Sequence, residues 1–286
     1  MIEVMQGTPG SGKSAVSVAR AILHLCKGGV VACNFSLVEG WAETIVRNKL
    51  MYRLLYALRY FLPDAAPRYL YRKATCLHSR FFRVDSLAAI RSINPVMQAV
   101  GIYKYTGKYC EGSGLLILDE AQLIFNARKW DKNMDWIEFF TQHRKLGWNV
   151  MMIAHTIEMI DAQIRPLAEF ESRFRNMQKL RFPVIGLPMS PYPMFIVIKR
   201  YAGLGAGASV IHSRALYPLP LWAARLYDSL LVFSAEHWGM DTTARHCGEP
   251  PAAPEVARDV GFNAVRRAQL IGPHWDEYLQ TVKVKQ

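Results

Sequence analysis

A glycine-rich octapeptide near the start of the chain constrains the fold more than any other feature: Gly7-Thr8-Pro9-Gly10-Ser11-Gly12-Lys13-Ser14. Its spacing, G-x-x-x-x-G-K-[ST], is typical of the phosphate-binding loop of nucleoside triphosphatases. Residues 1–5 are long enough for one strand, and apolar residues three or four apart predict a helix over 15–24. Because the motif requires a strand before it and a helix after it, the sequence predicts a nucleotide site here.

The residue types of this loop match the chemistry of phosphate binding. Glycines let the backbone curl so that successive N–H groups face the anion, and the positive end of the following helix dipole adds attraction. We expect Lys13 to reach the β- and γ-phosphates of ATP and the Ser14 hydroxyl to hold Mg²⁺. All eight residues are therefore predicted to bind the cofactor: Gly7, Thr8, Pro9, Gly10, Ser11, Gly12, Lys13 and Ser14.

A second apolar run, Gly114 to Leu118, ends in two carboxylates, Asp119 and Glu120. A fully apolar run predicts a buried parallel strand, and such a strand delivers the residues after it to the carboxyl edge of the sheet, beside the phosphate loop. Asp119 is expected to complete the Mg²⁺ shell, and Glu120 is expected to polarise the attacking water as a general base.

A third apolar run covers residues 149–154 and follows a predicted helix over 136–146 that Gly147 stops. His155 or Thr156, at the strand tip, would sense the γ-phosphate; the competing interpretation of His155 is an ordinary surface or core histidine. The three runs predict an α/β fold, a P-loop NTPase with a mainly parallel central sheet flanked by helices. They also predict ATP hydrolysis.

The charge balance predicts a polyanionic partner, because the 35 Lys and Arg residues outnumber the 23 Asp and Glu residues. Ten of the cations and only two acids lie in residues 47–91, whose first part has Leu every four residues with basic and aromatic residues between. This pattern predicts a basic helical insertion. It suits nucleic acid, an anionic membrane surface, or a solvated helix whose leucines pack inward.

Composition divides the chain into a P-loop ATPase domain, 1–235, and a linker with a C-terminal tail, 236–286, which has a short helix near 256–270. Five scattered cysteines predict neither a disulfide framework nor a structural zinc, and fit a reducing cytoplasm. The chain enters the first strand at once, so we expect no signal peptide. Residues 215–235 are apolar but contain Pro218, Pro220, Arg225 and Asp228, so we expect no membrane span there.

The first 235 residues resemble the zonula occludens toxin (Zot) family, which are assembly ATPases of filamentous phages related to the FtsK/HerA class of DNA-pumping proteins. The resemblance rests on the phosphate loop, Asn34, residues 115–122, His143 to Val150, and Tyr227-Asp228-Ser229. The chain departs from the family in having His155 where relatives commonly place Gln, and in showing no membrane span.

The resemblance implies an ATP-driven motor for phage DNA packaging or for virion assembly and extrusion. Its implied partners are phage DNA, further copies of itself in a homo-oligomeric ring, capsid or coat proteins, and an anionic membrane touched peripherally. The implied location is the host cytoplasm, at the inner membrane or on the virion. The alternative is a nucleotide-dependent membrane- or capsid-docking scaffold without sustained turnover. A small-molecule kinase is disfavoured because no compact lid segment is visible and the excess of cations would be unexplained.

In a ring, a cation from the neighbouring subunit is expected to neutralise charge on the transferring phosphoryl group. Arg144, at a predicted helix end, is the preferred candidate for this catalytic role, and Arg173 and Arg175 are the reserves. A surface Arg that caps a helix C-terminus is the competing interpretation.

Overall fold

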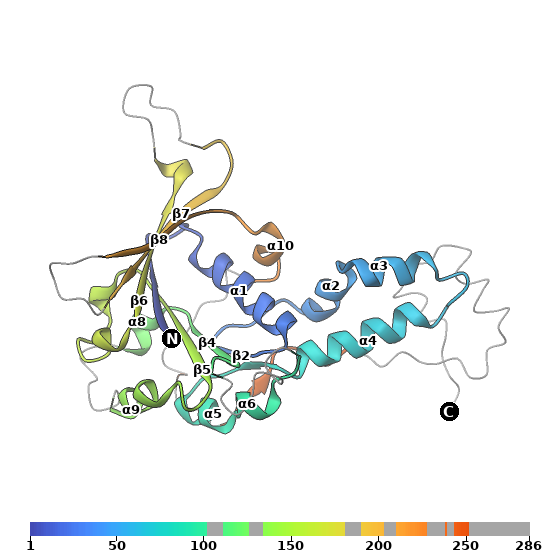
Figure 1. Cartoon of the computed structure of the whole chain (residues 1–286), viewed down its shortest axis with the longest axis horizontal. Coiled ribbons are helices and arrows are strands. Elements are labelled where there is room, and N and C mark those ends of the chain that lie inside the picture. The colour runs from blue at the N-terminus through green and yellow to red at the C-terminus, as the bar shows by residue number, and fades with distance from the viewer. Residues whose placement is uncertain are drawn as a thin grey trace. The chain divides into compact units, whose positions relative to one another are not determined.

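The computed structural model describes residues 1–101, 111–125, 134–180, 190–202, 210–227, 238 and 243–251. The chain forms two compact units, which are treated separately below (Figure 1). The first unit comprises Met1–Val38 and Arg80–Cys247, and the second comprises Glu39–Ser79 and Gly248–Gln286.

Within the described residues, nine strands of the first unit form one sheet in the order β8-β7-β6-β1-β5-β4-β2-β3-β9. Strands β6, β1, β5, β4, β2 and β3 run parallel, and β7, β8 and β9 are antiparallel to their neighbours. The bounds are β1 Ile2–Gln6, β2 Val30–Cys33, β3 Phe81–Arg83, β4 Gly114–Leu118, β5 Trp148–Ala154, β6 Phe170–Asn176, β7 Met194–Tyr201, β8 Ile211–Pro218 and β9 Arg245–His246. The predicted α/β class with a mainly parallel sheet is confirmed.

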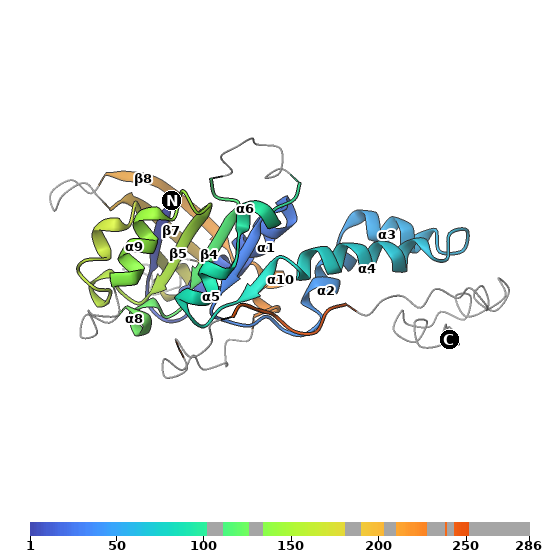
Figure 2. The same cartoon turned by 90° about the horizontal axis from the view of Figure 1, so that it is seen from below.

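Helices cover both faces of this sheet, as Figures 1 and 2 show. The helices of the first unit are α1 Lys13–Lys27, α5 Leu87–Ser92, α6 Pro95–Gln98, α8 Ala121–Ile124, α9 Met134–Gln142 and α10 Leu221–Ala224, with single 3-10 turns η2 Ile157–Met159, η3 Arg165–Leu167 and η4 Met177–Lys179. Helix α1 packs against α10 and against β2, β4 and β5. It ends at Gly28, whose φ of 105° lets its N–H bond back to the last turn.

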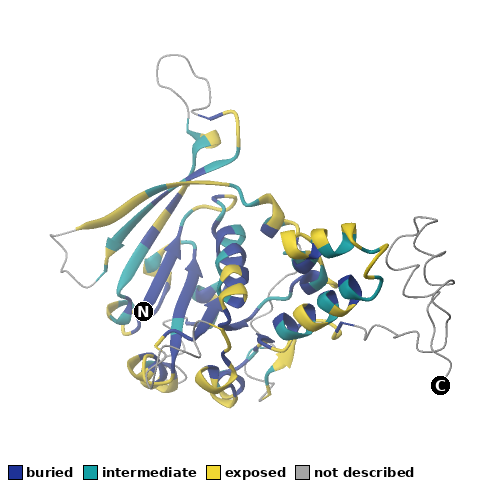
Figure 3. Ribbon diagram, turned by 45° about the vertical axis from the view of Figure 1, so that its right-hand side comes forward, coloured by how far each residue is buried: buried dark blue, intermediate teal, exposed yellow. Residues whose placement is uncertain are grey.

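The main core lies between the sheet and helices α5, α8 and α9. Side chains alternate along each strand, so Val4, Leu116 and Val150 reach this face from three different strands. Trp136 and Phe140 of α9 pack against Phe125 at ring centroid distances of 5.0 and 5.6 Å. The central strands are buried throughout, whereas β8 is largely exposed (Figure 3). Burial on both faces explains why the β4 run carries no polar residue.

The second unit contains α2 Trp41–Arg47, α3 Leu50–Ala57 and α4 Ala65–His78. Its interior holds Trp41 and Val46 of α2 and Leu70 and Leu77 of α4. The basic stretch is therefore helical in α3 and α4, as far as His78, and again from Leu87 in α5. Between α4 and α5 it contains strand β3, whose two phenylalanines are buried in the sheet of the first unit. Helix α3 covers only Leu50–Ala57, and residues 58–64 separate it from α4.

Other predictions fall partly outside the described residues. Strand β9 shows that the segment after residue 235 rejoins the sheet, whereas the helix near 256–270, residues 228–230 and Cys110 lie outside the described part. Residues 211–218, which overlap the apolar segment 215–235, form strand β8. Within the ranges that the structure describes, no helix combines the length and the apolar content needed to cross a bilayer.

Candidate functional site

The predicted phosphate loop connects the carboxyl end of β1 to α1, and its glycines are required by both conformation and packing. Gly7 and Gly12 have φ values of 154° and 86°. A Cβ at Gly7 would lie 2.6 Å from the carbonyl oxygen of Phe174, and one at Gly12 would lie 2.5 Å from the Phe195 ring. The loop therefore fits closely against β6 and β7, and only glycine is accommodated at these positions.

Lys13 lies over the curled backbone of this loop. Its Nζ donates to the carbonyl oxygen of Gly7 at 2.5 Å and to that of Thr8 at 3.2 Å. The residue is only 8% exposed, and this burial lowers the pKa of the ammonium, while the charges of Asp119 and Glu120 oppose the shift. The loop thus holds a partly desolvated cation where it can meet an anion.

Asp119 lies at the end of β4, and three elements hold it there. Its Oδ2 accepts hydrogen bonds from the Ser14 hydroxyl at 3.3 Å and from the Tyr227 hydroxyl at 3.1 Å. Asn34, just after β2, donates to the Asp119 carbonyl oxygen at 2.8 Å and accepts from the Asp119 N–H at 2.7 Å. Burial raises the pKa of Asp119, with a contribution from the Glu120 charge, although hydrogen bonds from the Glu120 N–H and from the Tyr227 and Ser14 hydroxyls oppose the shift.

The donor set at Ser14 and Asp119 fits Mg²⁺. A hydroxyl oxygen and a carboxylate oxygen are hard ligands, and Mg²⁺ is typically held by one or two carboxylates together with substrate phosphates. Burial also disfavours the charged form of Asp119, and a bound cation would stabilise that charged form.

Glu120 has a backbone conformation that is unusual for a residue with a side chain. Its φ of 52° makes it the one non-glycine residue in the described ranges with positive φ. Its Oε2 accepts a hydrogen bond from Gln122 Nε2 and lies 3.7 Å from His155 Nε2. Backbone outliers of this kind concentrate at functional sites, and here the outlier turns a carboxylate toward the tip of β5.

His155 follows β5, the strand between β1 and β4. Its carbonyl oxygen accepts a hydrogen bond from the Gly7 N–H at 3.1 Å, while its ring faces Glu120. The structure therefore brings His155 together with both the loop and the predicted base. Its side-chain partner is the carboxylate of Glu120.

The three candidate arginines lie in two places, Arg144 at the amino edge of the sheet and Arg173 and Arg175 on strand β6. Arg144 precedes β5 at the amino edge and pairs with Glu169 at 2.8 Å. The seven residues of β5 separate that edge from the loop by about 20 Å, so Arg144 is not close to the loop of its own chain. Arg173 stands beside Gln6 in the register of β6 with β1, near the loop, and pairs with Glu171 at 2.6 Å; Arg175 is exposed on the same strand.

Four residues at the site were given no role there from the sequence: Asn34 and Tyr227, which were noted only for the family resemblance, and Lys179 and Asn176. Tyr227 reaches Asp119, as described above. Lys179 Nζ donates to the Pro9 carbonyl oxygen at 3.0 Å, and Asn176 Nδ2 donates to the Gly10 carbonyl oxygen at 3.2 Å. Lys179 thus supplies a second cation at the loop. The sequence signal for it is the basic composition of residues 170–181, which contain three arginines and Lys179.

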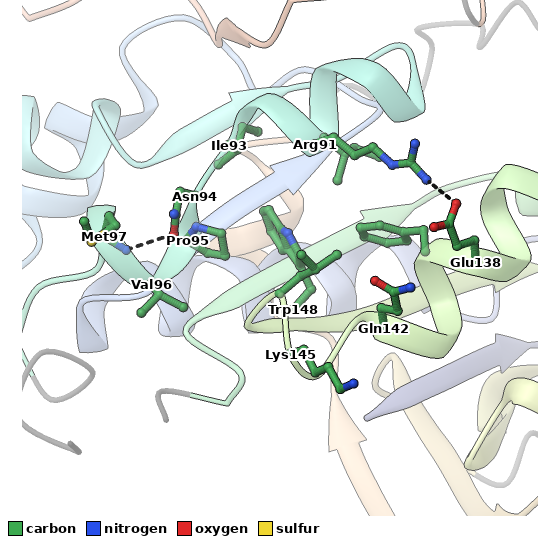
Figure 4. A pocket seen from close by; sticks show the side chains of 13 residues that line it. Arg91, Ile93, Asn94, Pro95, Val96, Met97, Glu138, Gln142, Lys145 and Trp148 are labelled. Carbon is green, nitrogen blue, oxygen red and sulfur yellow. Dashed lines mark hydrogen bonds and ion pairs between the residues drawn. The ribbon is translucent and has the colours of Figure 1, made fainter. Parts of the chain in front are cut away.

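A separate cavity of about 470 Å³ lies between α5, α6 and α9 (Figure 4). Trp148 and Pro95 line it, and the ion pair of Arg91 with Glu138, 3.2 Å long, closes one side. Trp148 begins β5, so this cavity opens at the edge of the sheet opposite to the phosphate loop. It is therefore not part of the candidate nucleotide site.

The sheet order, the phosphate loop and the carboxylates that follow β4 define a P-loop NTPase fold. A family model described as Zonular occludens toxin (Zot) matches residues 81–229, which is more than half of the chain. The chain belongs to this family, and the resemblance noted from its motifs is confirmed.

Relatives of known name support this assignment. The Gene 1 protein of Enterobacteria phage I2-2 is 32% identical over 189 residues, and that of Salmonella phage IKe is 30% identical over 188. Each alignment covers 65% of this chain and 43% of the relative, so the chain spans less than half the length of the relatives it matches.

Two solved structures are also similar. The N-terminal domain of zonular occludens toxin from Neisseria meningitidis is 14% identical with a TM-score of 0.40, and the match covers 79% of this chain and 98% of that one. A genome packaging NTPase of Sulfolobus turreted icosahedral virus 2, in complex with AMPPCP, is 14% identical with a TM-score of 0.34, and the match covers 74% and 96%.

Proposed function

We propose that this chain binds ATP with Mg²⁺ at the Gly7–Ser14 loop and hydrolyses it. One observation carries the proposal: the Ser14 hydroxyl lies 3.3 Å from Asp119 Oδ2, beside a loop that holds the Lys13 ammonium over its backbone. These are two oxygen ligands and one cation at a single anion-binding turn. The viral packaging NTPase noted above has been solved with AMPPCP and with ATP-gammaS, which supports a nucleotide as the ligand.

Each residue has a role that follows from its contacts. Lys13 and the loop N–H groups would bind the β- and γ-phosphates. Ser14 and Asp119 would hold Mg²⁺, which neutralises phosphate charge when bound. Glu120 would accept the proton of the attacking water, because its carboxylate is near the loop and only partly buried.

His155 fits a positioning role for Glu120. Its ring nitrogen is 3.7 Å from the carboxylate, while its own carbonyl oxygen bonds to the loop at Gly7. A shift of the loop backbone at Gly7 when phosphate binds or leaves would therefore be transmitted to the Glu120 carboxylate through His155. Direct sensing of the γ-phosphate by His155 remains the alternative role at this position.

Hydrolysis would drive the movement of phage DNA during virion assembly or packaging. The named relatives are Gene 1 proteins of phages, and one structural neighbour is called a genome packaging NTPase. The net charge of +12 supports a polyanion as the substrate. We propose that residues 1–235 are the motor unit and that this unit works as a homo-oligomeric ring in the host cytoplasm. Coat or capsid proteins would be its partners. In the ring, each subunit would supply Arg144 to the nucleotide site of its neighbour.

The test is ATP turnover with and without added DNA. Lys13→Ala and Glu120→Gln should each lower kcat by about a hundredfold or more, and Glu120→Gln should still bind ATP, because it removes the base and keeps the shape. Glu158→Gln, an exposed change on η2, is the matched control. Normal turnover in folded Lys13→Ala protein would disprove the site. Wild-type ATP binding without DNA-stimulated turnover would instead favour a nucleotide-dependent scaffold.

A further inference from the structure

Helices α3 and α4 form a hairpin in the second unit, and this hairpin has its own packed interior. Tyr52 of α3 and Ala66, Leu70 and Ala74 of α4 are buried. At helical spacing these residues lie on one side of each helix, so the opposite sides face outward.

The outward side of α3 is apolar. Leu50, Leu54 and Leu58 follow one another at four-residue spacing and are 72%, 50% and 46% exposed, and Phe61 in the following turn is 75% exposed. The sequence had left open a helix whose leucines pack inward, and the structure places Tyr52 there instead. Four large apolar side chains in one stripe are more than a solvated helix normally presents.

Basic residues greatly outnumber acids in the segment that carries this stripe. Asp64 is the one acid between residues 49 and 73, and it pairs with Arg68 at 3.6 Å. The Arg59 guanidinium stacks on the Tyr56 ring at 4.4 Å, which places a cation beside an amphipathic aromatic side chain. The six basic residues of this segment are Lys49, Arg53, Arg59, Arg68, Arg72 and Lys73.

We propose that this hairpin docks on an anionic lipid surface, with α3 lying in the plane of the interface. The apolar stripe would enter the boundary between headgroups and acyl chains, and the long basic side chains would extend to the headgroup level. The proposal goes beyond the proposed ATPase activity and does not depend on it.

The chemistry of the hairpin favours lipid over the two other occupants. Nucleic acid phosphates would match the cations, but three of the four stripe residues are leucines, which have no π-face on which a base could stack. A second copy of the hairpin would cover the leucines, but it would bring two sets of like charges together across one interface. An anionic bilayer matches both the stripe and the charge.

The experiment is flotation of the full-length chain with phosphatidylcholine vesicles, with and without phosphatidylglycerol, in the absence of nucleotide. The variant L50Q/L54Q/L58Q/F61Q removes the stripe and keeps every cation. The control L23Q/L216Q/L221Q/Y192Q removes four exposed apolar residues of the first unit. We expect the first variant to lose about tenfold or more of its partitioning onto anionic vesicles and the control to lose none.

A second variant, R53Q/R72Q/K73Q, keeps the stripe and tests the charge. It should bind anionic vesicles more weakly and with a smaller dependence on salt than the wild type. Circular dichroism and ATP turnover of each variant establish that the chain is folded and separate a failure of this proposal from a failure of the ATPase proposal.

Three results would overturn the proposal. One is unchanged vesicle binding by the L50Q/L54Q/L58Q/F61Q variant. The second is loss of DNA binding by that variant with vesicle binding intact, which would assign the hairpin to nucleic acid. The third is an oligomer that the variant dissociates while vesicle binding persists, which would assign the stripe to a second copy.

Discussion

Tyr227, which follows α10, donates a hydrogen bond to Asp119 at the candidate site. It is an example of a single site residue whose role could not be predicted from the sequence. It lies 108 residues from Asp119 in the chain, and no spacing rule relates a lone tyrosine to a distant carboxylate. The loop and the two acids could be predicted because their contacts are built into local motifs. Tyr227 and Lys179 reach the site only through the pairing of strands and the packing of α10, which the sequence does not encode locally.

We expect Tyr227→Phe to weaken the use of Mg²⁺ by the enzyme. Burial and the nearby Asp119 charge raise the pKa of the Tyr227 hydroxyl, so it stays protonated and donates to Asp119. Loss of such a supporting hydrogen bond typically costs about 10- to 100-fold in metal affinity or activity. The measurement is the Mg²⁺ concentration that gives half-maximal turnover, which should rise.

Tyr217→Phe, on exposed strand β8, is the matched control. An unchanged Mg²⁺ dependence in Tyr227→Phe would mean that the hydroxyl only fills space beside Asp119. The aromatic ring itself is kept in this variant, so its edge-on contact with Phe35, at 5.3 Å, is preserved.

At the scale of elements, the strands that the sequence predicted are those with long apolar runs. From the sequence, β6 was singled out only for Arg173 and Arg175, although its residues alternate between buried Ser172 and Phe174 and exposed Arg173 and Arg175. That period of two is the signal of a half-covered strand. β3 has only three residues between Arg80 and Val84, too few to show any period.

A buried ion network joins β1, α1 and β7, and its removal should destabilise the fold. Glu3 is 1% exposed and accepts from Arg20 through both oxygens at 3.1 Å, with Lys199 at 3.4 Å. Glu3→Gln would leave two cations without their partner, so we expect the free energy of unfolding to fall by about 2–4 kcal/mol. The exposed pair of Arg91 with Glu138 offers the control, and Glu138→Gln should cost less than about 1 kcal/mol.

The pH dependence of this network has a definite sign. Burial alone would raise the pKa of Glu3, but Arg20, Ser172 and Lys199 outweigh it, so the pKa lies below its ordinary value of 4.5. Stabilisation by an acid with a depressed pKa is present above the ordinary value and is lost as the pH falls through the folded-state pKa. Denaturant titrations should therefore show the gap between wild type and Glu3→Gln narrowing below pH 4.5, and a constant gap would contradict this account.

At the scale of the whole molecule, the proposed role of Arg144 requires that each nucleotide site be completed by the neighbouring subunit of a ring. Mixing Arg144→Ala with Lys13→Ala subunits, each inactive alone, should restore part of the ATP turnover. Some interfaces would then combine an intact Lys13 with an intact Arg144. Arg173→Ala and Arg175→Ala, mixed in the same way, test the two arginines nearer the loop. No recovery in mixtures shown to co-assemble would remove Arg144 from this role.

Strand β5 also connects the turn at Arg144, at the amino edge of the sheet, with the phosphate loop at the opposite edge. Its amino end follows the Arg144 turn that Glu169 holds, and its carboxyl end bonds to the loop through His155. Because β1 and β4 pair with β5 along both sides, we expect β5 to move as a rigid element between the two edges of the sheet. A force on the turn would move the tip beside Glu120. Glu169→Gln, which releases the turn, should therefore change kcat a few-fold in the assembled protein with unchanged ATP affinity, and a parallel change in affinity would exclude this transmission.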